Sequence, residues 1–520
     1  MEVTLDFLNK IYRRFFDEVN MGKAELKSGI DKKKGKKKKG FVRENVESIL
    51  IAIALAFILR IFVVEAFKIP TGSMAPTLLG QHRLVKCPNC SWKFECDHSA
   101  DYVRCSNCFY KIHISGYMKR GGNRILVNKF VYDFGKPKRW DISVFKYPFS
   151  DVTCLSCGYT SRQSTICKKC SNDIKRENYL TGKVNTIKGY LGLTQYHKVV
   201  CKTCNTKEII VCEQCGSTNV HVGRKNYIKR VIGLPEERLQ IVNGDIYING
   251  RVQRKPAKVQ EELWAPVFDS NYPAHQEIVK NWEAKDDFWD IDKRQLQLKL
   301  PEGFTQASYA TFERQITDYN VYNSKITDAI DGDIMVKFDV VTSRNSGGIS
   351  IILEKDEKTF EAFIRSRGEK RESYLKMSNM IIVSDANIFI ELENKCRIEF
   401  SNVDKRVSLK LNGSEVFSHT YDDDLLPSDN YTKYSKLKIG GVNTEAVFKN
   451  ISIFRDVYYT NAGEWGTLRP AEIGEKEYFF LGDNSRNSND SRFWKFVPES
   501  SLVGKAFMVF WPLRTIKFIR

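Results

Sequence analysis

The sequence predicts a mainly β protein with one membrane-spanning helix near its N-terminus, and three observations support this fold class. Short runs of alternating apolar and polar residues, from GDIMVKFDVV to FKNISIFRDVYY, are separated by turn residues, as in antiparallel sheets. The segment at residues 46–67, VESILIAIALAFILRIFVVEAF, is apolar over nearly its whole length, which predicts a membrane helix. Twelve of the 14 cysteines form C-x-x-C pairs, which are typical of small stabilised β modules.

The charge balance favours an anionic neighbour, either nucleic acid or a phospholipid surface. The 520 residues include 82 Lys+Arg and 63 Asp+Glu, a formal net charge of +19. Seven lysines lie within residues 32–39, shortly before the apolar segment, and lysines beside a membrane helix tend to stay in the cytoplasm. We therefore expect a single-pass protein of the cytoplasmic membrane, with residues 1–45 inside and everything after the helix outside. Arg60 interrupts the span and is expected to snorkel or to lie at the outer interface. A buried core helix is one alternative, and a cleavable signal peptide is another, which the late start of the apolar run disfavours.

Six C-x-x-C pairs lie in two stretches, residues 85–112 and 152–218. Taken in chain order, they form three groups that resemble zinc ribbons: Cys87, Cys90, Cys105 and Cys108; Cys154, Cys157, Cys167 and Cys170; Cys201, Cys204, Cys212 and Cys215. Two such turns joined by a hairpin can supply four thiolates to a tetrahedral zinc ion. An oxidising compartment would allow disulfides between the same cysteines, and the sequence leaves both open. Cys396 is expected in a core, and Cys96 as a spare ligand or a buried side chain.

Three segments carry residue types suited to hydrolysis. In KIPTGSMAPTLLG, Ser73 lies in a turn whose backbone amides can face a substrate. In KNYIKRVIGLPEE, strand alternation places Lys229 among apolar neighbours, where desolvation lowers the pKa of the amine and makes it a base for a serine. Residues 478–494 form an aromatic strand and a polar loop that can brace a site. Each segment alone is weak, because such serines are usually structural and such lysines usually exposed.

Together, these segments resemble the bacterial type I signal peptidases, the S26 family. The stretches IPTGSMAPT, NRILVNKFVYDFGKPKRWDISVF, YIKRVIGLPEE and GDNSRNSNDSRFW are similar to the four catalytic-domain boxes of that family, and they follow its order behind a membrane anchor. The resemblance covers residues 46–80, 123–148, 224–250 and 476–514. It implies an antiparallel β catalytic domain that hydrolyses signal peptides with a Ser/Lys dyad.

The resemblance also implies a role for each matching residue. Ser73 matches the nucleophile, Lys229 the general base, and Thr71 with the Ser73 amide the oxyanion hole. Met74 is expected to line the site, and Ser488 matches the hydroxyl that holds the lysine. The remaining matches are structural, namely the ion pair of Asp490 with Arg492 and the loop of Gly482, Asp483 and Asn484.

Two positions depart from the family pattern, since Glu236 and Lys495 stand where glycine is usual. Neither is catalytic, and both concern local loop shape. The implied activity is that of signal peptidase I, a serine endopeptidase that cuts exported preproteins after small residues of the Ala-x-Ala type. It requires no cofactor for catalysis, and the seven histidines show no metalloprotease spacing.

Large insertions separate the boxes. Residues 68–250 and 461–520 are expected to form the two parts of the peptidase domain, with a linker-like region at 251–280 and a β-sandwich at 281–460 between them. The sandwich resembles concanavalin-like domains, so a carbohydrate or protein ligand is one hypothesis and an inert insertion the other. Trp264, Trp282 and Trp289 are expected either in a core or as a sugar platform.

Other functions compete with proteolysis. One is a membrane-tethered scaffold, in which the ribbons and the sandwich hold a partner and the peptidase core is inactive. Another is nucleic-acid binding by basic zinc ribbons, which an external location disfavours, so no nucleic-acid partner is expected. A soluble self-cleaving repressor-type peptidase uses a similar Ser/Lys pair, but the membrane segment and the GDN loop disfavour it.

Overall fold

The computed structural model describes residues 64–164, 175–181, 194–200, 207–209, 211–217, 220–223, 225–322, 331–355, 358–421 and 435–519. All of these ranges belong to one compact unit, Phe62–Arg520. The basic segment 1–45 and residues 46–63 of the expected membrane helix lie outside them. Within these ranges, no helix has the length and apolar character needed to cross a membrane.

Residues 64–67, the last four of the expected membrane helix, are extended, so the prediction of helix was wrong there. They belong to β1 (Val64–Lys68), which pairs antiparallel with β7 (Arg124–Asn128). Their backbone groups bond to the neighbouring strand, and Phe67 packs against the core below the serine turn. The Phe67 side chain is therefore part of the packing of the folded domain.

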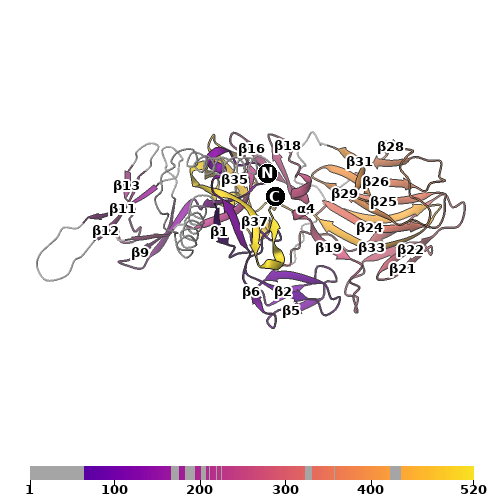
Figure 1. Cartoon of the computed structure of the whole chain (residues 1–520), viewed down its shortest axis with the longest axis horizontal. Coiled ribbons are helices and arrows are strands. Elements are labelled where there is room, and N and C mark those ends of the chain that lie inside the picture. The colour runs from indigo at the N-terminus through magenta and orange to yellow at the C-terminus, as the bar shows by residue number, and fades with distance from the viewer. Residues whose placement is uncertain are drawn as a thin grey trace, which may run out of the picture. The chain divides into compact units, whose positions relative to one another are not determined.

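The serine turn follows β1 at the edge of an eight-stranded sheet. After β1 and β7, the strand order is β37 (Leu502–Trp511), β8 (Ile142–Lys146), β15 (Asn226–Gly233), β35 (Glu477–Leu481) and β36 (Val497–Pro498), with β38 (Lys517–Phe518) on β37. Figure 1 shows indigo β1 close to yellow β37, because segments from both ends of the described chain share this sheet. A second sheet of four strands contains β18 (Arg251–Val252), β17 (Asp245–Ile248), β16 (Arg238–Val242) and β34 (Ala471–Glu472). The short helices are α3 (Val131–Phe134), α4 (Ala257–Leu263) and α5 (Ser491–Trp494).

The long insertion folds into a β-sandwich of two antiparallel sheets. The first contains β21 (Trp289–Ile291), β22 (Gln295–Lys299), β33 (Glu445–Arg455), β24 (Ile334–Thr342), β29 (Cys396–Val403), β30 (Arg406–Leu411), β31 (Ser414–Thr420) and β19 (Ala265–Asp269). The second contains β20 (Trp282–Ala284), β23 (Ala307–Phe312), β32 (Ser435–Val442), β25 (Gly348–Lys355), β26 (Lys358–Arg365), β27 (Ser373–Met377) and β28 (Met380–Asp385). One apolar core joins the inner faces. Residues 251–280, expected to be linker-like, contain β18, α4 and β19.

The cysteine-rich stretches form small sheets of their own. The first has β3 (Lys93–Asp97), β2 (His82–Lys86) and β6 (Lys119–Arg120), and a hairpin of β4 (Tyr102–Arg104) with β5 (Lys111–His113). The second has β10 (Thr160–Ser164), β9 (Phe149–Cys154) and β14 (Val220–Gly223), and a separate sheet of β11 (Lys175–Thr181), β12 (Thr194–Val200) and β13 (Lys207–Ile209). The described chain is thus mainly β, as the sequence predicts.

Candidate active site

Ser73 and Lys229 are hydrogen bonded, although 156 positions separate them in the sequence. The Lys229 Nζ lies 2.6 Å from the Ser73 Oγ, and it also donates to the Ile228 carbonyl at 3.2 Å. Lys229 comes from β15, in the interior of the eight-stranded sheet, and the serine turn follows the edge strand β1. The two side chains predicted to react therefore meet.

Burial makes the Lys229 amine easier to deprotonate. Lys229 is 4% exposed, and desolvation lowers its pKa from the ordinary 10.5 to about 8, against the opposing effect of the Asp490 and Asp483 carboxylates. A substantial fraction of such an amine is neutral near pH 8 and can accept a proton from the serine hydroxyl.

The serine turn is held by the loop after β35. The Asn484 amide N–H donates to the Ser73 carbonyl at 3.1 Å, and Asn484 Nδ2 donates to the Gly72 carbonyl at 3.2 Å. A Cβ at Gly482 would lie 2.5 Å from the Ser73 carbonyl oxygen and 2.2 Å from the Ser488 Oγ. Only glycine allows this loop to approach the turn so closely.

Two fully buried ion pairs brace that loop. Arg230, next to the lysine, contacts both oxygens of Asp483 at 2.8 Å and donates to the Trp140 carbonyl. Arg492 contacts both oxygens of Asp490 at 2.8 and 2.9 Å. A buried ion pair is stable only when its polar groups are hydrogen bonded. The two arginines therefore hold Asp483 and Asp490, and with them the loop, in one position. The pairing of Arg230 with Asp483 is not evident from the sequence, where its one signal is the Lys-Arg pair within an apolar strand.

A cavity of about 770 Å³ opens beside the dyad. Its lining residues are Pro70, Thr71, Ser73, Lys225, Asn226, Tyr227, Ile228, Lys229, Arg486, Asn487, Ser488, Asn489 and Phe493. Thr71 is exposed there, and among the described residues the Ser73 amide donates to no backbone carbonyl. Both groups are thus available to a substrate oxygen.

Two supporting residues differ from what the resemblance implies. Met74, expected to line the site, is fully buried in the core below the turn and is absent from the cavity wall. Ser488 is beside the site, but in the described part of the chain its Oγ has no hydrogen-bond partner. The lysine instead bonds Ser73 and a backbone carbonyl.

Glu236 and Lys495 both adopt the backbone conformation that glycine favours. Their φ angles are +65° and +73°, in the left-handed region. The loops therefore keep a backbone shape suited to glycine although each residue carries a side chain. A positive φ is strained for such residues, and neither residue is one of the reacting groups.

The chain is similar to known proteins. The family described as "Signal peptidase, peptidase S26" matches residues 42–91, 118–303 and 424–511, which is more than half of the chain. The chain belongs to this family. It is similar to the probable signal peptidase I-2 of Synechocystis sp., with 48% identity over 44 residues, which are 8% of this chain and 20% of that protein. It is also 62% identical over 37 residues to signal peptidase I of Buchnera aphidicola subsp. Acyrthosiphon pisum, covering 7% and 12% of the two chains.

This S26 member therefore spans a quarter or less of the length of the first curated relatives it matches. Among solved structures, it is similar to a carbohydrate-binding module, CBM66, from Bacillus subtilis, with 11% identity and a TM-score of 0.24, covering 34% of this chain and 96% of the module. No conclusion about a ligand follows from that value. In the sandwich itself, Trp282 packs against Phe268 and Phe312 in the core, and Trp289 stacks on Phe448.

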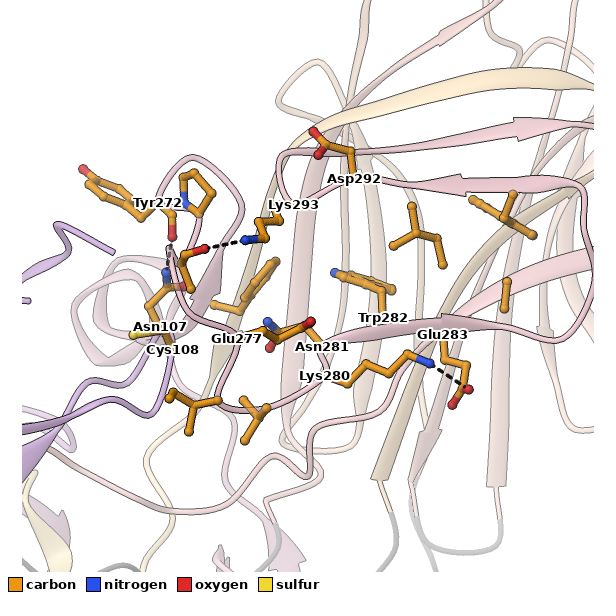
Figure 2. A pocket seen from close by; sticks show the side chains of 18 of the residues that line it. Asn107, Cys108, Tyr272, Glu277, Lys280, Asn281, Trp282, Glu283, Asp292 and Lys293 are labelled. Carbon is orange, nitrogen blue, oxygen red and sulfur yellow. Dashed lines mark hydrogen bonds and ion pairs between the residues drawn. The ribbon is translucent and has the colours of Figure 1, made fainter. Parts of the chain in front are cut away.

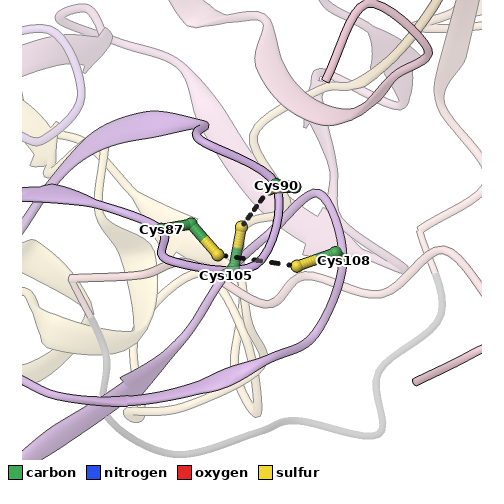
Figure 3. A group of neighbouring side chains, drawn as sticks. All are labelled: Cys87, Cys90, Cys105 and Cys108. Atoms are coloured by element: carbon green, nitrogen blue, oxygen red, sulfur yellow. Dashed lines mark hydrogen bonds between the residues drawn. The ribbon is translucent and has the colours of Figure 1, made fainter. Parts of the chain in front are cut away.

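The first cysteine group of this family member has the geometry of a metal site. Cys87, Cys90, Cys105 and Cys108 are buried, and their sulfurs all lie within 4.8 Å of one another. Two of the sulfur pairs, Cys87 with Cys108 and Cys90 with Cys105, are 3.6 Å apart (Figure 3). A disulfide requires about 2.05 Å. Four sulfurs about 2.3 Å from a tetrahedral zinc ion would be about 3.8 Å apart. Cys96 is buried outside the group, in the core of the same module.

The second described group differs from the grouping that chain order suggests. Cys154 and Cys157 meet Cys212 and Cys215, and the sulfurs of Cys154 and Cys215, and of Cys157 and Cys212, are again 3.6 Å apart. The reason is that β9, which ends at Cys154, pairs with β14, which begins five residues after Cys215, so the turns beside these two strands meet. Cys167, Cys170, Cys201 and Cys204 lie outside the described residues.

A third group, the carboxylates of Asp245, Asp333 and Asp404, is not free for a cation. Lys255 Nζ lies 2.6 Å from both Asp404 and Asp456, and Lys355 pairs with Asp333. These ammonium groups already supply the positive charge. Because β17 carries Asp245, the network joins the four-stranded sheet to the sandwich.

Proposed function

We propose that this chain is a serine endopeptidase of the signal peptidase I type, which removes signal peptides from exported preproteins with Ser73 as nucleophile and Lys229 as general base. The observation that carries the proposal is the 2.6 Å contact between a buried lysine of lowered pKa and a serine hydroxyl that faces an open cavity.

The mechanism follows from these positions. Neutral Lys229 takes the proton of the Ser73 hydroxyl as the Oγ attacks the scissile carbonyl, and the Ser73 amide with Thr71 stabilises the oxyanion. The resulting ammonium returns the proton to the leaving amine. Lys229 then activates water, which hydrolyses the acyl-enzyme. Asp483 and Asp490 lie close enough to stabilise the ammonium while it exists, since both raise the pKa of Lys229.

The substrate and location are proposed on the same basis. We propose cleavage after small residues of the Ala-x-Ala type on the extracytoplasmic side of the cytoplasmic membrane, with residues 46–63 as the main part of the anchor. Both described four-cysteine groups are proposed to hold structural zinc, which is supported by their unbonded sulfur spacing. The zinc takes no part in the reaction.

The test uses the purified full-length chain and a preprotein with an Ala-x-Ala site. Ser73→Ala and Lys229→Ala should each lower the cleavage rate at least about 1,000-fold, because each removes one member of the reacting pair. Matched controls are Ser418→Ala and Lys299→Ala, which change exposed strand residues and should leave the rate unchanged. Activity in the Ser73→Ala and Lys229→Ala variants equal to that of the parent chain would overturn the proposal.

A further inference from the structure

A segment of the sandwich insertion reaches the serine turn. Residues 314–322, here called the strap, follow β23 and belong to neither sheet of the sandwich. The strap contacts the first cysteine module, the catalytic loop and the turn that contains Ser73. No family box includes it.

The first cysteine module, residues 82–120, contacts the sandwich through its two C-x-x-C turns, here called knuckles. Asn89, between Cys87 and Cys90, exchanges two hydrogen bonds of 2.8 Å with Gln276. Asn107, between Cys105 and Cys108, donates to the Tyr272 carbonyl at 2.8 Å and accepts from the Asp269 amide at 2.7 Å. Figure 2 shows the Asn107 contact with the Tyr272 loop, at the wall of a cavity of about 530 Å³.

The strap adds bonds to the backbone beside the cysteines. Arg314 Nη1 donates to the Asn107 carbonyl at 2.7 Å. The Tyr319 hydroxyl donates to the Arg104 carbonyl at 2.8 Å and accepts from the Arg104 amide at 3.0 Å. Since Arg104 and Asn107 directly precede Cys105 and Cys108, the second knuckle serves as a fixed anchor for the strap.

The other contacts of the strap are in the catalytic part. The buried Asp318 carboxylate pairs with Arg486, which lies in the loop between Asn484 and Ser488. The Tyr322 ring lies against Gly72, because a Cβ on that glycine would be 2.5 Å from Tyr322 Cδ1 and 2.7 Å from Cε1. Tyr322 is 3% exposed, so the ring fills the space beside the residue that precedes Ser73.

We infer that Tyr322 is a positioning residue for the proteolysis proposed above, and that the strap holds the Ser73 turn through the contact of its ring with Gly72. The inference rests on the proposed function. Glycine has more backbone freedom than any other residue, so the turn relies on outside contacts to keep the Ser73 hydroxyl beside Lys229. A displacement of about 1 Å at such a site lowers the rate on the order of 100-fold.

The first experiment compares Tyr322→Ala with Tyr322→Phe in the full-length chain. The alanine variant should lower kcat about 10- to 100-fold with KM nearly unchanged, because Tyr322 is not part of the cavity wall. The phenylalanine variant should keep the parent rate, since among the described residues the Tyr322 hydroxyl has no hydrogen-bond partner. A kcat for Tyr322→Ala equal to that of the parent would overturn the inference. A parent chain that cleaves nothing would instead overturn the proposed function.

A double-mutant cycle tests the contact directly. Gly72→Ala places a methyl group against the ring and should lower kcat, whereas Gly72→Ala combined with Tyr322→Ala has room for that methyl group. The double variant should therefore be faster than the product of the two single effects. Thermal unfolding of all variants separates loss of fold from loss of positioning. Losses in kcat that simply multiply, in folded variants, would overturn the inference.

Discussion

The cysteine groups and the serine site bring distant residues together in different ways. Each of the four described knuckles is a complete local structure: the amide four residues after the first cysteine donates to that cysteine's carbonyl, and the residue at that position has positive φ. These residues are Ser91, Phe109, Gly158 and Gly216. Ser73, Lys229 and Asn484 share no such local form and meet only through sheet order. The C-x-x-C spacing therefore identifies two of the four cysteines of a candidate metal site. No local sequence pattern identifies either Ser73 or Lys229 as a member of the dyad.

The largest expected effect concerns which knuckles share one ion. Cys157→Ser and Cys212→Ser should each remove the one zinc ion proposed for their group, because their sulfurs lie together. Structural zinc contributes on the order of 10 kcal/mol to folding. The measurement is zinc per chain by mass spectrometry after dialysis. The double variant should lose no more zinc than either single variant, and Cys396→Ser, in the sandwich core, should lose none. A double variant that loses two ions would contradict this grouping.

The next effect concerns the buried ion pairs in the loop that holds the serine turn. Asp483→Ala leaves Arg230 buried without its carboxylate and should lower the free energy of unfolding by about 3–5 kcal/mol, measured by urea denaturation. Glu283→Ala breaks the exposed pair with Lys280 and should change it by less than about 1 kcal/mol. Equal effects of the two substitutions would remove the distinction between buried and exposed pairs.

The third effect concerns the pH response of Lys229, the proposed general base. Burial lowers the pKa of Lys229 to about 8, so kcat/KM should rise with pH through that value and be about 100-fold lower at pH 6 than on the plateau. Stability should follow the same direction. In the unfolded chain, Lys229 keeps its proton up to its ordinary pKa of 10.5, whereas in the folded chain it loses the proton near pH 8. The loss of folding free energy caused by burying the charged amine is therefore largest below pH 8, and it declines as the pH rises to 10.5. A flat rate profile between pH 6 and pH 9 would exclude Lys229 as the base.

The smallest effect concerns local strain in the catalytic part. Glu236→Gly should raise the free energy of unfolding by about 0.5 kcal/mol, because relief of the positive φ slightly exceeds the entropy lost by glycine. The control is Glu236→Ala, which keeps the Cβ and should bring no gain. Thermal unfolding of the two variants in parallel measures the difference, and an equal gain in both would contradict the assignment of strain.

Much of the molecule can be predicted from the sequence, and the exceptions have physical causes. The β fold, the meeting of Ser73 with Lys229, and the unusual positions of Glu236 and Lys495 all follow from sequence pattern or family resemblance. The interior location of Met74 does not, because a turn residue can face either the cavity or the core. The extended conformation of residues 64–67 does not follow from the sequence either, because the end of an apolar run has the same composition in a helix and in a strand.

The sequence alone determined the local pieces of this protein: the knuckles, the strands and the reactive residue types, all of which depend on spacing along the chain. Tertiary structure decided which pieces meet. The joining of Cys154 with Cys212 depends on the pairing of β9 with β14, and the contact of Tyr322 with Gly72 depends on where an insertion returns to the catalytic sheet. Contacts between residues far apart in the chain arise from packing of the whole fold, which no local pattern records.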